Sequence, residues 1–311
     1  MVKKITYYKN CKIFKKHKGS IILIGSFDGL HLGHQKLFKE AIKLKKKTRL
    51  KIGVLTFDPI PKMFFFKNLK NYRISNLNQK INLFSKFSVD FMINQKFNKQ
   101  FSKISCDQFI KKILYKDLNA RYIFVSNNFR FGYKRQGNVN LLKKLQEQYH
   151  YKIIKPSPLK KSKKIVSSSL IRRLLEKGKI NLANNYLNRN WAIEGVVQRG
   201  RQLGKKIGFP TCNLNLQNYV LSKTGVYAVK VYINNSKRAL SGIANLGYRP
   251  TFNQNKVLLE VNIFNFNKNL YNKKINVEFI KFIRGEKKFS GISQLKKQIK
   301  LDINKVKNIF K

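Results

Sequence analysis

The fold of this chain is decided by Gly25–His34, which reads Gly-Ser-Phe-Asp-Gly-Leu-His-Leu-Gly-His. A short apolar run, Ile21–Ile24, lies directly before it, and apolar residues at helical spacing follow it in Leu37–Ile42. An apolar run of this length between glycines predicts a strand, and the later spacing predicts a helix. The stretch is therefore expected to form a turn between the carboxyl end of a strand and the start of a helix.

Such a turn predicts an anion-binding site. The free N–H groups at a helix start and the positive end of the helix dipole attract phosphate. Gly25, Gly29 and Gly33 allow a close approach of the backbone. His31 and His34 are two of the chain's four histidines, and they add donors at the helix start. A metal site is less well supported, because no third ligand with suitable spacing lies nearby.

The length and charge of the chain limit the class of protein. A length of 311 residues predicts two domains, and a hydrophobic content of 42% can build a core in each. The 67 Lys and Arg residues outnumber 13 Asp and Glu, which gives a formal charge of +54. A nucleic-acid-binding protein is therefore one alternative. We do not expect a specific nucleic-acid partner, because the basic residues are spread over the whole length among Asn, Ile and Phe, as AT-rich codon usage would produce.

Cysteine usage and hydropathy indicate the compartment. Cys11, Cys106 and Cys212 are far apart and form no Cys-x-x-Cys pair, which is typical of a reduced cytosol. The first apolar run stops at Gly25, and no segment approaches the eighteen or so apolar residues that span a bilayer. We expect a soluble cytoplasmic protein without a membrane partner, monomeric or weakly oligomeric.

The first part of the chain alternates strands with helices, which predicts a Rossmann-like α/β domain with a parallel sheet. Further strands are expected at Lys51–Phe57, Val89–Ile93 and Tyr122–Val125. Ligands of such sheets bind at the carboxyl ends of the strands. The polar loop Ser126–Gly132 follows the last of these strands and should lie at the same edge as Gly25–His34.

From Trp191 onward, short strands rich in Val, Ile, Tyr and Phe alternate with Gly or Asn turns, which predicts a closed antiparallel β-barrel. Apolar spacing over Ile292–Ile309 predicts an amphipathic C-terminal helix on the barrel. We place the domain boundary near residue 187, giving domains 1–187 and 188–311. The expected strands are Trp191–Val197, Gly225–Ile233, Leu240–Asn245, Leu258–Phe266 and Ile275–Ile283.

A serine run opens a predicted helix at the end of the first domain. Ser167, Ser168 and Ser169 precede apolar residues at helical spacing, with Arg172 one turn further on. Hydroxyls and a guanidinium in this arrangement can clamp a triphosphate. Serine capping of an ordinary helix explains the same pattern equally well.

A basic glycine-rich loop in the second domain predicts another phosphate site. Its glycines are Gly200, Gly204 and Gly208, and Lys205 lies between them. Backbone N–H groups of such a loop can wrap phosphates. The hydroxyl of Thr211 and the amide oxygen of Asn213 lie two residues apart in extended chain, so they face the same way and suit Mg²⁺. The alternative is a mobile basic loop between strands.

Glu260 is a candidate general base. It lies in the expected strand Leu258–Phe266, on the face opposite Leu259 and Val261, in a chain with few carboxylates. A carboxylate there could accept the proton of an attacking hydroxyl in phosphoryl transfer. The alternative is an ordinary solvated strand residue.

These motifs resemble known signatures. Gly25–His34 resembles the first signature of the nucleotidyltransferase superfamily, and its Phe27-Asp28-Gly29 version resembles the bacterial bifunctional riboflavin kinase/FAD synthetase family. Ser167–Arg172 resembles the second signature of that family. Gly208–Asn213 resembles the Pro-Thr-Ala-Asn signature of riboflavin kinases, and the resemblance continues to the terminal helix.

The resemblance implies two reactions, phosphorylation of riboflavin to FMN and adenylylation of FMN to FAD, with ATP and Mg²⁺; flavins are substrate and products. It implies Glu260 as base, stabilisation of phosphate charge by His31, His34 and Arg172, and Thr211 and Asn213 for Mg²⁺. The ATP-binding residues expected are Gly25, Phe27, Asp28, Gly29, Gly33, Ser168, Ser169, Gly200, Gly204, Lys205 and Gly208. The flavin-binding residues expected are Asn128, Phe129, Arg130, Arg284 and Glu286. The rival enzyme is another adenylyltransferase of the superfamily, which leaves the barrel unexplained.

Some positions depart from the family pattern. The family usually has Asn where this chain has Ser26, His at Ile60, and Gly with an Asp in the loop that begins at Ser126. We expect these changes to slow FAD synthesis. In the second domain Cys212 replaces Ala and Asn262 replaces His, while the proposed metal ligands and base are intact.

Overall fold

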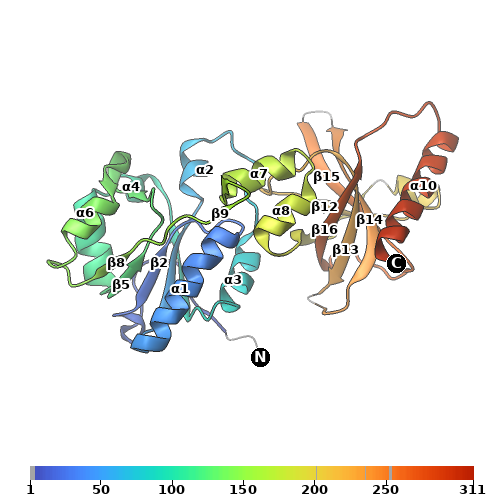
Figure 1. Cartoon of the computed structure of the whole chain (residues 1–311). Coiled ribbons are helices and arrows are strands. Elements are labelled where there is room, and N and C mark those ends of the chain that lie inside the picture. The colour runs from blue at the N-terminus through green and yellow to red at the C-terminus, as the bar shows by residue number, and fades with distance from the viewer. Residues whose placement is uncertain (1–3, 201, 235, 252–253) are drawn as a thin grey trace. The chain divides into compact units, whose positions relative to one another are not determined.

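The computed structural model describes residues 4–200, 202–234, 236–251 and 254–311. The chain divides into two compact units (Figure 1). The first consists of Met1–Lys70 and Leu77–Ser167, and the second of Asn71–Asn76 and Ser168–Lys311. We call Asn71–Asn76 the inserted segment, because its sequence neighbours on both sides belong to the first unit.

The first unit is built on a six-stranded sheet in which every pair of neighbours is parallel. This confirms the predicted α/β class. The strand order is β1 (Thr6–Tyr8), β4 (Phe91–Lys96), β3 (Ile52–Asp58), β2 (Ile21–Ile24), β5 (Tyr122–Phe124) and β8 (Lys152–Ile154). The chain passes outward from β2 in one direction through β3 and β4 and returns to the other side at β5. The switch point, where α/β sheets bind ligands, therefore lies between the ends of β2 and β5.

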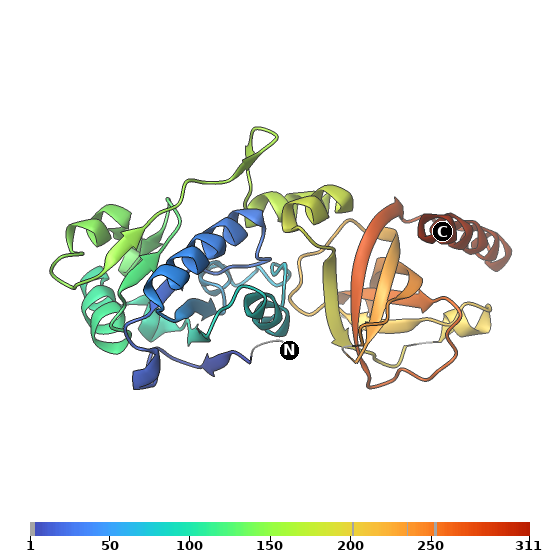
Figure 2. The ribbon, with the colours of Figure 1, turned by 60° about the horizontal axis from the view of Figure 1, so that its bottom comes forward.

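Alternating side chains of the strands form two apolar layers. Ile21 and Leu23 of β2 pack with α1 (Leu32–Thr48) and α3 (Leu77–Ser85) on one face of the sheet. Ile22 and Ile24 pack with η2 (Phe109–Asp117) and α6 (Val139–Lys144) on the other face. Figure 2 shows α1 running alongside the strands. The smaller elements are η1 (Lys15–His17), α2 (Pro61–Phe65), α4 (Lys99–Ser102), α5 (Cys106–Gln108), β6 (Arg130–Phe131), η3 (Tyr133–Arg135), β7 (Gly137–Asn138), β9 (Lys160–Lys161) and β10 (Lys164–Ile165).

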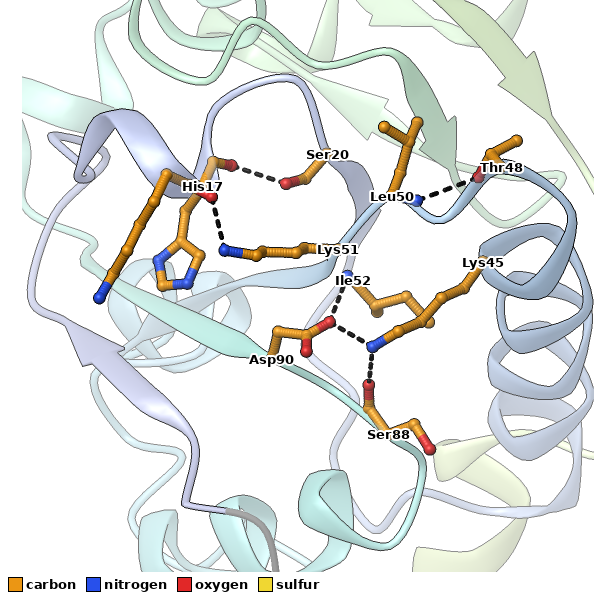
Figure 3. Close-up of polar contacts among 10 residues, drawn as sticks. His17, Ser20, Lys45, Thr48, Leu50, Lys51, Ile52, Ser88 and Asp90 are labelled. Atoms are coloured by element: carbon orange, nitrogen blue, oxygen red, sulfur yellow. Dashed lines mark hydrogen bonds and ion pairs between the residues drawn. The ribbon is translucent and has the colours of Figure 1, made fainter.

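A polar cluster fixes the amino ends of the central strands (Figure 3). Asp90, just before β4, accepts hydrogen bonds from the Ile52 N–H at 2.8 Å and from the Lys45 ammonium of α1. Ser20, just before β2, donates to the carbonyl oxygen of His17 at 2.7 Å. These contacts lie at the edge of the sheet opposite the strand ends that carry the predicted site, so they stabilise the scaffold.

The second unit contains a six-stranded antiparallel sheet that curls into a barrel. Its strand order is β11 (Trp191–Val196), β16 (Lys274–Arg284), β13 (Gly225–Ile233), β14 (Leu240–Thr251), β15 (Gln254–Ile263) and β12 (Cys212–Asn215). An antiparallel bridge between Gln198 and Asn213 joins the two outer strands of this order. The predicted barrel is confirmed, although β14 and β15 extend further toward their connection than expected.

Helices complete the second unit. The predicted C-terminal helix is α10 (Ile292–Phe310), which lies beside the barrel strands (Figure 1). Its Val306 packs on Val226, Ala228 and Ile243 of the barrel. The others are α7 (Ser168–Glu176), α8 (Ile180–Leu187) and α9 (Leu203–Lys206). In the described part of the chain, no helix has both the length and the apolar character that a membrane span requires.

The inserted segment is bonded into the second unit. The indole N–H of Trp191 donates to the Ile74 carbonyl at 3.0 Å, and the Val220 N–H donates to the Arg73 carbonyl at 2.7 Å. The amide of Asn76 donates to the Glu194 carboxylate at 3.1 Å. These hydrogen bonds make the six residues of the inserted segment part of the barrel unit's structure, which the sequence did not predict.

Candidate active sites

The turn after β2 has the predicted strand–turn–helix geometry. Phe27, Gly29 and Leu30 have φ of 45°, 78° and 36°, all in the left-handed region. Non-glycine residues with such backbone angles are uncommon and cluster at functional sites. The Phe27 side chain is buried under the turn, and Asp28 is buried as well. Repeated left-handed residues reverse the chain sharply, which delivers it into α1 at the carboxyl edge of the sheet.

The two histidines are stacked at the start of α1. His31 is the N-cap, and its Nδ1 accepts the His34 N–H at 3.3 Å. The imidazole centroids are 3.7 Å apart with an interplanar angle of 19°. The ring of Phe27 meets His34 edge-on at 5.2 Å. The rings thus hold each other at the positive end of the helix, where phosphate charge is favoured.

A side chain at position 33 would be crowded. A Cβ there would lie 3.0 Å from the carbonyl oxygen of Val166 and 3.2 Å from the His31 ring. Val166 directly precedes the serine run, so the missing side chain lets that backbone approach the start of α1. At Gly25 a Cβ would meet the Phe27 ring at 3.2 Å.

The serine run opens helix α7, which begins at Ser168 and includes Ser169. Arg172, one turn further on, is buried. Its guanidinium lies 3.6 Å from the Tyr72 ring centroid, and its Nε donates to the Tyr72 carbonyl at 2.7 Å. The contact of Arg172 with the inserted segment was not predicted, because these residues are 100 apart in sequence. Arg172 belongs to the second unit and the histidines to the first.

The loop after β5 carries the residues predicted to bind flavin in the first domain. Asn128 and Arg130 are exposed, and Ser126 donates to the Asn128 side-chain oxygen at 3.0 Å. Phe129 is half-buried and stacks on Phe131 at 5.5 Å. β5 is the neighbour of β2, so this loop and the turn at Gly25 follow adjacent strands at the switch point.

A cavity of about 430 Å³ in the second unit is lined by six of the residues predicted for that domain; Gly200, Lys205 and Gly208 are not among its lining residues. Its walls come from β12, β15, the chain after β16, and helix α10. Predicted residues in its lining are Gly204, Thr211, Asn213, Glu260, Arg284 and Glu286. Residues up to 82 positions apart (Gly204 and Glu286) therefore meet around one space, as a nucleotide or flavin site requires.

Strand register places the candidate base beside a candidate metal ligand. Glu260 lies opposite Asn213 on one side and opposite Asn245 on the other. Asn213 is 6% exposed, and its side-chain oxygen makes no hydrogen bond within the described residues. A buried amide oxygen without a donor, next to a hydroxyl and a carboxylate, has the chemistry of an Mg²⁺ site. The residues present therefore fit the expected ion.

The glycine loop folds tightly against these ligands. A Cβ at Gly200 would lie 1.9 Å from the Asn213 amide nitrogen, and one at Gly204 would lie 2.4 Å from the Phe209 carbonyl oxygen. Gly208 has φ of 89°, which favours glycine. Lys205 lies in α9, and its side chain is outside the described part of the structure.

Arg284 is held by a partner that the sequence did not reveal. Its Nε donates to both carboxylate oxygens of Asp302 at 3.1 and 2.9 Å, and a terminal nitrogen lies 2.8 Å from Oδ2. Asp302 lies on α10, is buried, and also accepts from Gln298 at 2.9 Å. Arg284 lines the cavity, yet its guanidinium also fastens the terminal helix. Glu286 is exposed at the cavity wall, beside Gly247.

The chain thus has two sites suited to binding phosphate, one on the parallel sheet and one in the antiparallel barrel. Together they define the class of protein, a two-domain nucleotide-dependent transferase. The FAD synthetase family matches residues 13–170, and the riboflavin kinase family matches residues 187–310. The chain belongs to the bifunctional riboflavin kinase/FMN adenylyltransferase family, whose activities make FMN from riboflavin and FAD from FMN.

Similar proteins agree over nearly the whole length. The bifunctional riboflavin kinase/FMN adenylyltransferase of Buchnera aphidicola subsp. Schizaphis graminum is 41% identical over 95% of this chain and 96% of its own length. The Escherichia coli K12 protein of the same name is 33% identical over 92% and 91%. A Streptococcus pneumoniae crystal structure described as a macrolide-efflux protein has a TM-score of 0.84 and 28% identity, and the match covers 99% of each chain.

Proposed function

We propose that the barrel cavity phosphorylates riboflavin, with Glu260 as the general base. The carboxylate takes the proton of the ribityl 5'-hydroxyl while that oxygen attacks the terminal phosphorus of ATP and ADP leaves. The observation that carries this assignment is the convergence of Thr211, Asn213 and Glu260 on one cavity. The glycine loop around Gly204 supplies backbone to the phosphates.

Mg²⁺ is expected to accompany ATP in this cavity. Thr211 and Asn213 would hold it through their side-chain oxygens, as the buried amide oxygen of Asn213 supports. When bound, the ion neutralises phosphate charge. Removing divalent cations with a chelator should stop FMN formation, and excess MgCl₂ should restore it.

The turn at Gly25 is proposed to carry adenylyl transfer. An FMN phosphate oxygen attacks the α-phosphorus of ATP, and pyrophosphate leaves. His31, His34 and the first N–H groups of α1 stabilise the charge on the phosphates, in a position supported by the stacked rings at the helix start. No covalent intermediate on the enzyme is needed. Residues 128–130 would contact the flavin, and Arg172 is the proposed additional cation for the phosphates.

We assign adenylyl transfer to residues 1–187 and the kinase reaction to residues 188–311. The family matches, which end at 170 and begin at 187, support this division. Helices α7 and α8 belong to the second unit by their contacts. The proposed boundary between the two activities, at residue 187, therefore differs from the boundary between the two packed units, at residue 167.

One assay separates the two activities. The chain is incubated with riboflavin, ATP and MgCl₂, and the flavins are separated by chromatography over time. Glu260→Gln should abolish FMN formation and leave conversion of supplied FMN to FAD. A double His31→Ala, His34→Ala variant should do the reverse. Equal loss of both steps in either variant would contradict the assignment.

A panel of phosphorylated acceptors tests the rival adenylyltransferase. Pantetheine phosphate and nicotinamide mononucleotide replace FMN in the same assay. Adenylylation of either acceptor in place of FMN would favour the rival.

A further inference from the structure

A lysine is buried beneath the first-domain turn. Lys80 of α3 is 2% exposed and is one of the largest fully buried side chains of the described residues. Lysine is almost never buried to this degree without polar partners, because loss of hydration penalises the ammonium. A lysine in such a place needs a structural or functional reason.

The ammonium of Lys80 contacts the turn itself. Its Nζ donates to the Ser26 carbonyl at 3.4 Å and to the Thr56 hydroxyl at 3.5 Å. Thr56, fully buried on β3, donates its hydroxyl to the same Ser26 carbonyl at 3.3 Å. Two donors from different elements therefore meet at one backbone oxygen of the predicted phosphate site.

The contact with the Ser26 carbonyl also sets the direction of the next N–H group in the turn, that of Phe27. In a trans peptide the C=O and the following N–H point in opposite directions. Drawing the Ser26 carbonyl toward Lys80 therefore turns the Phe27 N–H away from the protein interior. Within the described residues that N–H makes no hydrogen bond. Phe27 has a left-handed φ of 45°, a conformation that persists only where the surroundings enforce it.

We propose that Lys80 is a positioning residue for adenylyl transfer, which holds the Ser26 carbonyl so that the Phe27 N–H is presented to a nucleotide phosphate. The inference rests on the proposed adenylyl transfer at this turn and adds a residue outside the recognised motif. Lys80 itself touches no substrate in this role.

Lys80→Met tests the proposal, with Lys80→Arg as the conservative variant. A preoriented N–H acts on charge that develops in the transition state, so kcat for FAD formation from FMN should fall about a hundredfold, with a smaller change in KM for ATP. Arg should restore part of the loss. FMN formation from riboflavin, measured on the same preparation, should not change. Lys86→Met, at an exposed site just after α3, is the matched control and should have no effect on either step.

Thr56→Val gives a second route if the methionine variant does not fold. It removes one donor to Ser26, and loss of one uncharged hydrogen bond should lower kcat for FAD formation about five- to tenfold. Unchanged kcat in Lys80→Met, or in Thr56→Val if only that variant folds, overturns the proposal. So does equal impairment of both activities, or an Arg variant no better than Met. Absence of FAD formation by the unmodified chain would instead overturn the proposed function, and the role of Lys80 with it.

Discussion

Replacing Asp302 by Asn should loosen helix α10 from the barrel. The Asp302 side chain is 2% exposed and that of Arg284 17%, and they pair through two guanidinium nitrogens. Removing one charge of a buried pair leaves the other uncompensated, which typically costs 3–5 kcal/mol. Asn keeps one acceptor oxygen and nearly the same volume. We therefore expect the lower end, about 3 kcal/mol, in the free energy of unfolding of the second unit.

The chain offers a specific probe for this measurement. Its single tryptophan, Trp191, is 1% exposed in β11 of the second unit. Urea unfolding followed by its fluorescence reports that unit. With a urea dependence of about 2 kcal/mol per M, the midpoint should fall by about 1.5 M. Lys281→Gln is the control, because Lys281 is exposed on β16 of the same unit, and substitutions at exposed sites away from buried contacts usually change stability by about 0.5 kcal/mol or less.

A double-mutant cycle would show whether the pair itself is responsible. The double variant Arg284→Gln, Asp302→Asn should lose clearly less free energy of unfolding than the sum of the two single variants. The reason is that the second substitution removes a charge that the first has already left without its partner. An Asp302→Asn midpoint equal to that of the Lys281→Gln control would refute the reasoning. Additive single effects would show that the two side chains stabilise the barrel independently.

Three further outcomes follow from contacts in the two units. Asn262→Ala removes the 2.7 Å bond from its amide to the Pro210 carbonyl, next to the proposed metal ligand, so FMN formation should slow about tenfold while FAD formation from FMN stays unchanged. Burial, and then the charge of Lys51, lower the pKa of His17 below its ordinary 6.5, so the unfolded state binds the proton more readily. Stability of the first unit should therefore fall as pH drops below 6.5, and His17→Gln should flatten that dependence in calorimetry. A fragment of residues 168–311 lacks the inserted segment, so its Trp191 transition should occur at lower urea than in the intact chain; equal midpoints would show that the segment adds no stability.

The local motifs could be predicted because the backbone conformation of each depends on a few neighbouring residues. The strand Ile21–Ile24, the glycine turn after it and the helix start at His31 fix a backbone path, and such a path favours anion binding. Thr211 and Asn213 face one way because alternate residues of extended chain do so. Asn213 lies opposite Glu260 because β12 and β15 are neighbouring strands of the barrel.

Contacts between distant residues could not be predicted in this way. Lys80 lies 54 positions from Ser26, and its own helix looks like any amphipathic surface helix in sequence. Arg284 was assigned to flavin from its motif, whereas its bond to Asp302 depends on where α10 packs. The inserted segment has no apolar periodicity of its own, and its role comes from donors such as Trp191. Each case depends on a partner that only the tertiary fold supplies.

The scarcity of acidic residues makes each one informative. The chain has 13 Asp and Glu against 67 Lys and Arg, so few carboxylates are available for structural or catalytic roles. Asp90, Glu194 and Asp302 are buried and each binds a cation or a backbone N–H, so they act as structural anchors. Asp28 lies buried in the first-domain turn, and Glu260 lines the barrel cavity. A carboxylate at a predicted phosphate site repels the phosphates, so ATP binding alone gives no reason for its presence there. The proposed proton transfer supplies such a reason for Glu260, because that reaction needs a carboxylate beside the phosphates.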